Sequence, residues 1–268
     1  DTLLGGDGAD TIDGGLGDDD ISGEDGADII TGGQGDDTID GGEGSDVAVF
    51  GGNREDYTIA VNESGTLTVT DANASTALGV DVISAVETLR FNDGDFTIAT
   101  AEDGSVTITG SDTGDVITIV GNVGVSVEGG QGADTIDGGS GDDIIDGGLG
   151  DDTISGGAGD DTITDQAGSD IMDGGDDDDV VLFAGTQSDY TFESSADGLT
   201  VTVTEISSGD ANDLTNVETL RFDDGDITVS ADSNGLVLTG STGVDEIAVV
   251  GSVPVTVLGG DEADVIDG

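Results

Sequence analysis

The sequence contains no cysteine, no histidine and no lysine, and these absences narrow the chemistry open to it. Without cysteine there can be no disulfide and no thiolate metal site. Without histidine, cysteine and lysine, the Ser-His-Asp, Cys-His and zinc-dependent catalytic schemes are closed. Paired carboxylates could still cleave a glycosidic bond, but the many equivalent aspartates single out no pair in an apolar pocket. We therefore expect that the protein is not an enzyme.

Positive charge is almost absent. The chain carries 61 acidic residues against three arginines, which gives a net charge of −58. This excludes nucleic acid as an electrostatic partner and disfavours binding to an anionic membrane surface. The same charge opposes compaction, so folding calls for a divalent cation. No apolar run is long enough to span a bilayer, so we expect no transmembrane segment, and the composition is compatible with an exported bacterial protein.

Glycine and aspartate, by contrast, recur with a period of nine residues. Five copies of the nonapeptide Gly-Gly-x-Gly-x-Asp-x-aliphatic-x run from Gly5 to Val49, and six more run from Gly129 to Leu182. We number the positions as slots one to nine; slot six is aspartate and slot eight is apolar in every copy. A period of nine fits one glycine-rich loop and one three-residue strand, and stacked units of this kind form a solenoid.

Two such units make a turn of eighteen residues, so slot-six carboxylates eighteen residues apart lie almost directly over each other, as with Asp10 and Asp28. Stacked carboxylates repel one another unless a cation lies between them. Flexible glycine loops that offer carboxylate and carbonyl oxygens are what Ca²⁺ selects. Because each turn buries only two aliphatic side chains, we expect that the solenoid does not fold without its ions.

These repeats resemble the RTX (repeats-in-toxin, haemolysin-type) nonapeptides of secreted bacterial proteins. The resemblance implies an all-β protein built on a right-handed parallel β-roll, with multiple Ca²⁺ ions between loops eighteen residues apart. It also implies the ligands of each ion. They are slots two, four and six of one unit, together with slots one, three and six of the unit eighteen residues later. Only slot six would use its side chain.

Carried along both runs, the implied pattern gives the expected calcium ligands. In the first run they are Asp1, Gly6, Gly8, Asp10, Gly14, Gly15, Leu16, Gly17, Asp19, Gly23, Glu24, Asp25, Gly26, Asp28, Gly32, Gln34, Asp37, Gly41, Glu43 and Asp46. In the second run they are Gly130, Gly132, Asp134, Gly139, Gly141, Asp143, Gly147, Gly148, Leu149, Gly150, Asp152, Gly156, Gly157, Ala158, Gly159, Asp161, Asp165, Ala167, Asp170, Gly174, Asp176 and Asp179.

The quality of the sites should vary along each run. Complete loops should hold the best-formed ions, between Asp10 and Asp28, Asp19 and Asp37, Asp134 and Asp152, and Asp143 and Asp161. Sites that use Glu24 or Asp165 in place of glycine should be weaker. The residues eighteen positions after Asp170 and Asp179 are Ser188 and Asp197, which lie in no complete loop. We therefore expect no ion beyond Asp46 or Asp179 in the same register.

A longer period joins the two runs. DVAVFGGNREDYTI follows the first run, and DVVLFAGTQSDYTF follows the second. We therefore divide the chain into a β-roll block at 1–49, a β-rich linker unit at 50–128, a second roll block at 129–182, a second linker unit at 183–258 and the start of a third roll block at 259–268. A roll block with its linker unit is called a module below. Because both ends fall inside a repeat, we expect that the chain is cut from a longer tandem array.

The linker units alternate apolar and polar residues, which predicts half-buried strands that cap or continue each roll. The expected strands are 57–61, 67–70, 89–91 and 106–108 in the first unit and 190–192 and 199–203 in the second. Segments 123–127 and 253–257 should re-enter the next roll, with Asp115 and Asp245 as degenerate slot-six residues.

Polar residues in the linker units are interpreted structurally. Asp93-Gly94 and Asp224-Gly225 are hairpin-turn signals. Their acidic residues, with Asp95 and Asp226, are interpreted as solvated hairpin tips rather than a further Ca²⁺ site. Arg90 and Arg221 should form structural ion pairs, with Glu87 and Glu218 as partners, or bond to a neighbouring loop carbonyl.

Two functions remain open. The first is a structural repeat of a secreted, cell-surface-associated bacterial protein, such as an adhesin extender, a filament or a surface layer, whose partners are calcium and neighbouring copies of the same repeat. The alternative is an RTX-type accessory module that binds an extracellular polysaccharide. The similarity of the two modules favours the first. Exposed aromatic residues or a basic stripe on the rolls would favour the second, and the rolls contain neither.

Overall fold

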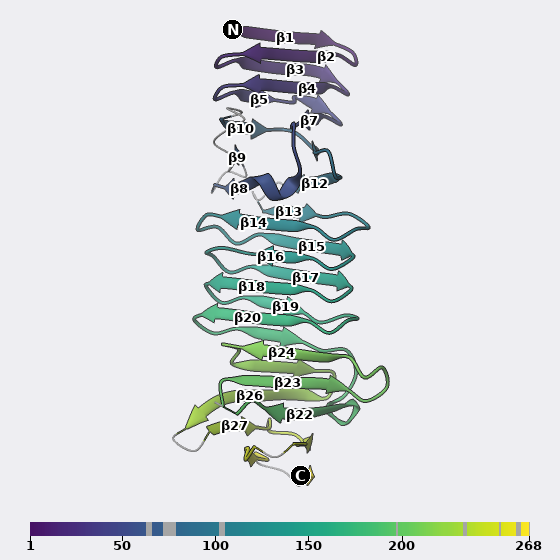
Figure 1. The fold of residues 1–268 in the computed structure, drawn as a ribbon, viewed down its shortest axis with the longest axis vertical. Helices are drawn as coiled ribbons and strands as arrows, with labels where there is room; N and C mark the ends of the chain where they lie inside the picture. Colours follow the sequence, from purple (N-terminus) through teal and green to yellow (C-terminus); the bar gives the residue numbers. More distant parts are fainter. Residues whose placement is uncertain are drawn as a thin grey trace.

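The computed structural model describes residues 1–62, 66–71, 79–101, 105–196, 198–232, 235–251, 253–260 and 264–267. The protein is an elongated column of stacked strands with its two termini at opposite ends (Figure 1). The strands form a β-solenoid of about 13 turns, which confirms the predicted all-β roll. The helices among the described residues are two short 3₁₀ segments, η1 (Arg54–Asp56) and η2 (Gln187–Asp189). No described helix is long and apolar enough to cross a membrane.

Two sheets run along the column. In the first, the order is β1 (Thr2–Asp7), β3 (Asp20–Gly26), β5 (Thr38–Asp40), β10 (Val80–Ser84), β9 (Leu67–Asp71), β8 (Tyr57–Val61), β14 (Val116–Val120), β16 (Thr135–Asp137), β18 (Thr153–Ala158), β20 (Ile171–Asp176), β24 (Ala211–Thr215), β23 (Thr200–Glu205) and β22 (Tyr190–Ser194), and β6 (Glu43–Gly44) also pairs with β3.

In the second sheet, the order is β2 (Thr11–Leu16), β4 (Ile29–Gln34), β7 (Val47–Val49), β11 (Thr88–Arg90), β12 (Asp95–Thr100), β13 (Val106–Thr109), β15 (Ser126–Gln131), β17 (Ile144–Leu149), β19 (Thr162–Thr164), β21 (Val180–Leu182), β25 (Thr219–Phe222), β26 (Gly225–Asp232), β27 (Gly235–Thr239) and β29 (Thr256–Leu258). A separate pair of strands, β28 (Glu246–Ala248) and β30 (Val265–Asp267), lies near the C-terminus.

Within each roll, consecutive strands alternate between the two sheets. Each strand pairs in parallel with the strand eighteen residues later, so that Ile12 lies beside Ile30 and Ile21 beside Ile39. The slot-eight side chains of both sheets fill the interior, and none in the two runs is more than 8% exposed. A strand places alternate side chains on opposite faces, which explains why slots seven and nine face outward on the two sides of slot eight.

The linker units continue both sheets instead of interrupting them. In the first unit, β10 pairs in parallel with β5 of the roll before it, and β8 pairs in parallel with β14, which leads into the next roll. Between these parallel joints, β10, β9 and β8 pair antiparallel. In the other sheet β11, β12 and β13 do the same between β7 and β15. The strands predicted at 57–61, 67–70 and 106–108 are confirmed, and the strand predicted at 89–91 lies one residue earlier, at Thr88–Arg90.

The second linker unit repeats this arrangement. Its strands β24 and β25 pair in parallel with β20 and β21 of the second roll, and β27 pairs in parallel with β29. An isolated parallel bridge joins Phe192 to Val249. Of the predicted third roll block, the structure describes residues 259, 260 and 264–267, which include β30. The two modules therefore share one strand topology.

Aromatic packing widens the core in the linker units. In the first unit Phe50, Tyr57, Phe91 and Phe96 contact one another with ring centroids 5.1–5.7 Å apart. The second unit has the matching cluster of Phe183, Tyr190, Phe192 and Phe222 at 5.2–6.1 Å. All eight aromatic residues of the chain are buried. These rings fill the space that antiparallel hairpins leave between the sheets.

The ion-pair partners expected for Arg90 and Arg221 were wrong. Arg90 pairs with Asp95 at 3.0 Å, and Arg221 pairs with Asp226 at 3.1 Å. Arg90 and Asp95 are directly opposite each other on β11 and β12, whereas a residue three positions away on one strand points to the other face. The expected solvated hairpin tips are therefore partly engaged: Asp95 and Asp226 hold these arginines.

Candidate metal sites

The slot-six aspartates form two ladders, one along each edge of a roll. The backbone N–H of one aspartate donates a hydrogen bond to Oδ1 of the aspartate eighteen residues later, as Asp10 does to Asp28 at 2.8 Å. The same bond, at 2.7–2.9 Å, joins Asp19 to Asp37, Asp28 to Asp46, Asp134 to Asp152, Asp143 to Asp161, Asp152 to Asp170, and Asp161 to Asp179. Each carboxylate is thus fixed in orientation by the loop before it.

The second oxygen of these carboxylates is left without a partner. Among the described residues, Oδ2 is buried and makes no hydrogen bond in Asp10, Asp19, Asp28, Asp37, Asp46, Asp134, Asp143, Asp161 and Asp179. Burial disfavours the charged form and raises the pKa of Asp134 and of Asp143 to about 7, and the neighbouring carboxylates of Asp152 and Asp161 add to the effect. A buried carboxylate oxygen without a donor is costly, and a cation would satisfy it.

Backbone carbonyls converge on the same places, and the glycines in slots one and four leave room for them. A Cβ atom on Gly5 would lie 2.5 Å from the carbonyl oxygen of Gly23 and 3.1 Å from Oδ2 of Asp10. A Cβ atom on Gly26 would overlap the carbonyl oxygen of Gly8 and lie 3.0 Å from Oδ1 of Asp28. Carbonyl oxygens from two loops and both slot-six carboxylates therefore line the space between those loops.

The carbonyl directions agree with the ligand set that the RTX resemblance implies. Slot-two and slot-four carbonyls point toward the later loop, as Gly15 does toward Gly33 and Gly8 toward Gly26. Slot-one carbonyls of the later loop point back, as Gly23 does toward Gly5. The slot-three carbonyl of the later loop also points back, and it accepts a hydrogen bond from the slot-four N–H of the earlier loop. The second lone pair of that carbonyl is left for an ion. The individual ligands stay a prediction.

This arrangement recurs at the other predicted ligands. The slot-one glycines Gly14, Gly23, Gly32, Gly147, Gly156 and Gly174 each have no room for a Cβ beside the Oδ2 of their own aspartate. The slot-four N–H of Gly17, Gly132, Gly141, Gly150 and Gly159 donates to the slot-three carbonyl of Gln34, Leu149, Ala158, Ala167 and Asp176. Pairing of Thr2 with Asp20 places Asp1 beside Asp19.

Non-glycine residues at loop positions keep the glycine conformation at a cost. Glu24 has φ of 71° and Asp177 has φ of 82°, the left-handed region that side chains disfavour. Asp165 occupies slot one as a buried side chain, and its Oδ1 accepts a hydrogen bond from Nδ2 of Asn212 at 2.7 Å. Burial raises the pKa of Asp165 to about 8.

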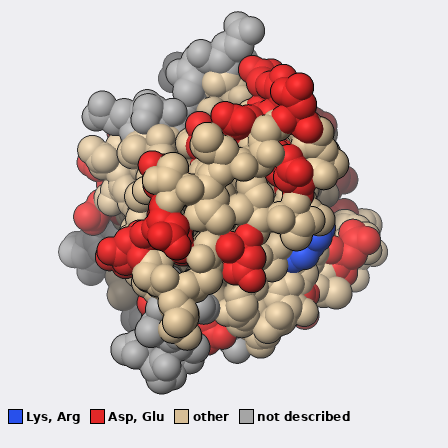
Figure 2. All heavy atoms as spheres, turned by 90° about the horizontal axis from the view of Figure 1, so that it is seen from above, with Lys and Arg blue, Asp and Glu red and all other residues tan. Residues whose placement is uncertain are grey.

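The donor set fits Ca²⁺ better than a transition metal. The described part of the chain holds no cluster of three or more His, Cys, Asp or Glu side chains able to bind a metal. A cation here would be held mainly by backbone carbonyls, with one carboxylate from each loop. All these ligands are hard oxygens on flexible loops, which suits Ca²⁺. The surface adds attraction, because Figure 2 shows acidic side chains around the end of the column and very little basic surface.

Where each linker unit leads into the next roll, a buried side chain of the linker unit contacts the first slot-six carboxylate. Asp115 and Asp245 do act as slot-six residues, since their N–H groups donate to Asp134 and Asp264 at 2.6 Å and 3.2 Å. In the first module the buried guanidinium of Arg54 forms an ion pair with Asp115 and lies 5.3 Å from the ring centroid of Phe96. In the second module the buried amide of Gln187 takes this place and donates to Asp245 at 3.0 Å.

The end of each roll contains residues that the sequence reasoning missed. The N–H groups of Asp37 and Asp46 donate to Asp81 and Glu87 of the first linker unit, and those of Asp170 and Asp179 donate to Asn212 and Glu218 of the second. The residue eighteen positions after Asp170 is Ser188, which was expected to hold no ion, and the N–H of Asp170 donates to Asn212 instead. The corresponding residue after Asp179, Asp197, lies outside the described residues. One signal was present in the sequence, because Glu87-Thr-Leu-Arg repeats the form of slots six to nine.

The sites define a class: a β-solenoid whose loops carry paired carboxylates and converging carbonyls for calcium. The model of the RTX calcium-binding nonapeptide repeat matches four stretches of the sequence, residues 1–30, 17–48, 126–154 and 146–181. The two roll blocks therefore belong to the RTX calcium-binding repeat family. Repeats of this family are typical of secreted bacterial proteins and are usually structural.

Comparison with solved structures gives 12 matching chains. One is the crystal structure of the extracellular lipase LipA from Serratia marcescens, with 23% sequence identity and a TM-score of 0.33. The match covers 81% of this chain and 38% of the lipase, so the chain spans well under half of that protein. No curated protein matches the sequence.

Proposed function

We propose that the chain is a calcium-stiffened structural segment of a secreted bacterial surface protein, such as an adhesin extender, a filament or a surface layer. The observation that carries the proposal is the continuity of both sheets. Each passes from one roll through the linker unit to the next roll by parallel joints, and the second module repeats the first. A protein built this way gains length by adding modules, and its function is mechanical rather than catalytic.

Calcium would control the stiffness. Each turn of a solenoid contacts only its neighbours, so its rigidity is the sum of turn-to-turn contacts. Here the slot-six carboxylates face each other across every turn of a roll, and an ion between them converts repulsion into a link. At low free Ca²⁺ the chain would stay unfolded, which suits export as an unfolded polypeptide. Neighbouring copies of the same module are the proposed partners, because β30 pairs in parallel with β28 as a further turn would.

The polysaccharide-binding alternative is less well supported. Sugar-binding faces commonly stack aromatic rings on the sugar, but all eight aromatic residues are buried in the linker units. The three arginines are engaged with Asp115, Asp95 and Asp226. An acidic column also repels acidic polysaccharides.

Small-angle X-ray scattering of the chain tests the proposal. About 13 turns at roughly 4.8 Å per strand predict a column of roughly 60 Å in millimolar Ca²⁺. In EDTA the radius of gyration should rise toward about 57 Å, the value for an unfolded chain of this length. A compact, near-spherical particle in Ca²⁺ would contradict the structural role. Calcium-dependent retention on an alginate or other polysaccharide column would favour the alternative.

A further inference from the structure

The last loop of each roll faces a glutamate of the linker unit in the same way that earlier loops face an aspartate. Glu87 immediately precedes β11, and Val47 pairs with Thr88 just as Ile29 pairs with Val47 one turn earlier. The N–H of Asp46 donates to Oε2 of Glu87 at 2.8 Å, and the N–H of Asp28 donates to Oδ1 of Asp46 at 2.7 Å. Glu87 thus stands in a slot-six position forty-one residues after Asp46.

A carbonyl is also present at the position that slot one supplies elsewhere. A Cβ atom on Gly41 would overlap the carbonyl oxygen of Ala85 and lie 2.9 Å from Oδ2 of Asp46. In the preceding turn, a Cβ atom on Gly23 would overlap the carbonyl oxygen of Gly41 in the same manner. Ala85 has φ of 49°, a conformation that favours glycine, so the chain accepts strain where this carbonyl is turned toward the loop.

One oxygen of the buried Asp46 carboxylate, which lies between these groups, accepts no hydrogen bond. Asp46 is fully buried, and its Oδ2 has no hydrogen-bond partner. Neither Asp46 nor Glu87 forms an ion pair among the described residues; the nearest linker arginine on this strand, Arg90, is held by Asp95. The Glu87 carboxylate and the Ala85 carbonyl therefore lie beside an Asp46 oxygen to which no group of the described protein donates a hydrogen bond.

The second module repeats every element of this arrangement. Asp179 is 1% exposed with an unpartnered Oδ2, and its N–H donates to Oε2 of Glu218 at 2.9 Å. A Cβ atom on Gly174 would overlap the carbonyl oxygen of Asn216, whose φ is 49°. At the opposite edge the modules differ, because Asp81 in the first is replaced by Asn212 in the second. Only the glutamate junction keeps the same donors in both.

We propose that each roll ends in one further Ca²⁺ site, shared between its last nonapeptide loop and the linker unit. Asp46, Glu87 and the carbonyl of Ala85 form it in the first module, and Asp179, Glu218 and the carbonyl of Asn216 form it in the second. The expectation that no ion lies beyond Asp46 and Asp179 assumed a partner eighteen residues away; the partner comes from the linker strand. The proposal rests on calcium binding by the rolls, but not on their mechanical role.

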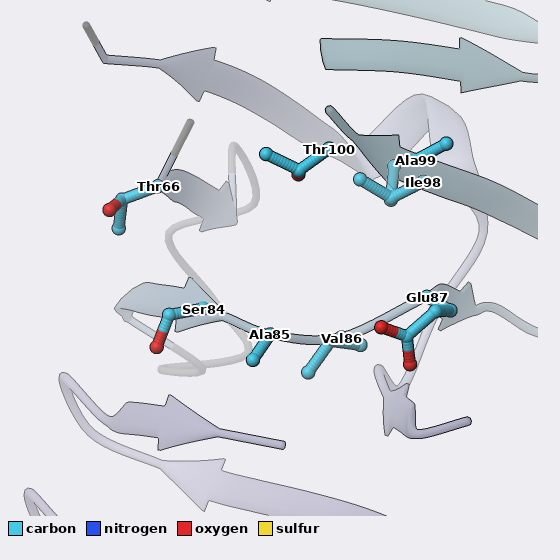
Figure 3. Close-up of a pocket in the computed structure, with 8 residues that line it drawn as sticks. All are labelled: Thr66, Ser84, Ala85, Val86, Glu87, Ile98, Ala99 and Thr100. Atoms are coloured by element: carbon cyan, nitrogen blue, oxygen red, sulfur yellow. The ribbon is translucent and has the colours of Figure 1, made fainter. Parts of the chain in front are cut away.

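The new sites are weaker than the loop–loop sites. Only Ala85, Val86 and Glu87 connect β10 to β11, so the protein offers fewer carbonyls than a six-residue loop does. Ca²⁺ takes six to eight oxygens, and water must supply the rest. A cavity of about 490 Å³ adjoins the first site, with Glu87 at one end of its lining and Ser84 at the other (Figure 3). A smaller cavity of about 160 Å³, lined in part by Asn216 and Glu218, adjoins the second.

Calcium stoichiometry of the whole chain tests the proposal. Glu87→Gln with Glu218→Gln removes both carboxylates while each amide oxygen can still accept the N–H of Asp46 or Asp179. The matched control is Asp40→Asn with Asp178→Asn, which removes two exposed charges at or beside the same two loops and touches none of the predicted ligands. By equilibrium dialysis at saturating Ca²⁺, the double variant should bind two ions fewer than the wild type, and the control should bind the same number. An unchanged stoichiometry in the glutamate variant would overturn the proposal.

A second measurement keeps the proposal testable if the double variant does not fold. Crystals of the wild-type chain grown with Ca²⁺ should give anomalous density between Asp46 and Glu87 and between Asp179 and Glu218. Density at the loop–loop aspartates without density at these two places would refute the proposal and leave calcium binding by the rolls intact. Absence of bound calcium everywhere would instead refute the calcium-stiffened function.

Discussion

Replacing Asp28 with asparagine should weaken two calcium sites at once. The Asp28 carboxylate faces Asp10 on one side and Asp46 on the other, and it is fully buried with an unpartnered Oδ2. Asparagine keeps the shape, and its amide oxygen can still accept the N–H of Asp10. The substitution therefore removes the charge and one oxygen ligand from two neighbouring sites while it preserves the backbone ladder.

The size of the effect follows from mass action. With dissociation constants of roughly 10⁻⁴–10⁻³ M and about 10 mM Ca²⁺, each site contributes about 1.4–2.7 kcal/mol to folding. Loss of two sites should then lower the free energy of unfolding by about 3–5 kcal/mol. Asp20→Asn is the matched control, because Asp20 lies on the adjacent strand with an exposed side chain and carries the same charge.

Urea unfolding followed by circular dichroism in about 10 mM Ca²⁺ measures both variants. Asp28→Asn should have a lower midpoint, and its midpoint should recover as Ca²⁺ is raised. Asp20→Asn should unfold like the wild type or slightly later, because it only reduces surface repulsion. Equal midpoints for the two variants would refute the assignment of Asp28 as a shared ligand.

Three other predictions follow from buried groups. Arg54→Gln leaves the buried Asp115 carboxylate without its cation, so the free energy of unfolding measured in urea should fall by about 3–5 kcal/mol. Gln187→Arg should instead raise the free energy of unfolding, because it supplies a cation to Asp245. No change in either variant would contradict the assigned contacts with Asp115 and Asp245. Gly23→Ala should cost about 1–3 kcal/mol, because its Cβ would overlap the Gly41 carbonyl, and Gly51→Ala, with open space around it, should be nearly neutral. In calcium-free buffer the pKa values of Asp134 and Asp143 in the roll are about 7, above the ordinary 3.8, because burial disfavours their charged form. The folded roll therefore holds protons that the unfolded chain has released between about pH 4 and 7, so the stability of the calcium-free roll falls as pH rises through that window. In EDTA the chain should be disordered at pH 8 and should gain β circular dichroism as the pH is lowered to 5, and no gain on acidification would contradict the assigned burial.

The rolls could be predicted from sequence because their contacts obey a short period. Any two slot-six aspartates eighteen residues apart are stacked by the strands between them, as with Asp134 and Asp152. The calcium chemistry follows from the same period, since glycine and aspartate return to the same edge at each turn. The strands of the linker units could be predicted as well, because apolar and polar residues alternate along any strand with one buried face, whether the strand pairs in parallel or antiparallel.

The joints between rolls and linker units could not be predicted, because their contacts have no fixed period. Asp46 meets Glu87 only after the chain has formed β8, β9 and β10 and returned to the roll. The ion pair between Arg54 and Asp115 joins residues that are even farther apart in the sequence. The partner of Arg90 was missed for a local reason, since a hairpin partner lies opposite and a neighbour three residues away points to the other face. The contacts within the rolls follow from the spacing of the repeats in the sequence. The contacts between rolls and linker units depend on how the hairpins of the linker units fold back.

Calcium should fold this chain, and a calcium titration followed by far-ultraviolet circular dichroism tests this most directly. The chain should give the spectrum of a disordered polypeptide in EDTA and a β spectrum in millimolar CaCl₂. The transition should be steep, because adjacent sites share their aspartates, and Mg²⁺ should substitute poorly for Ca²⁺. A β spectrum that is the same in EDTA and in CaCl₂ would contradict the account.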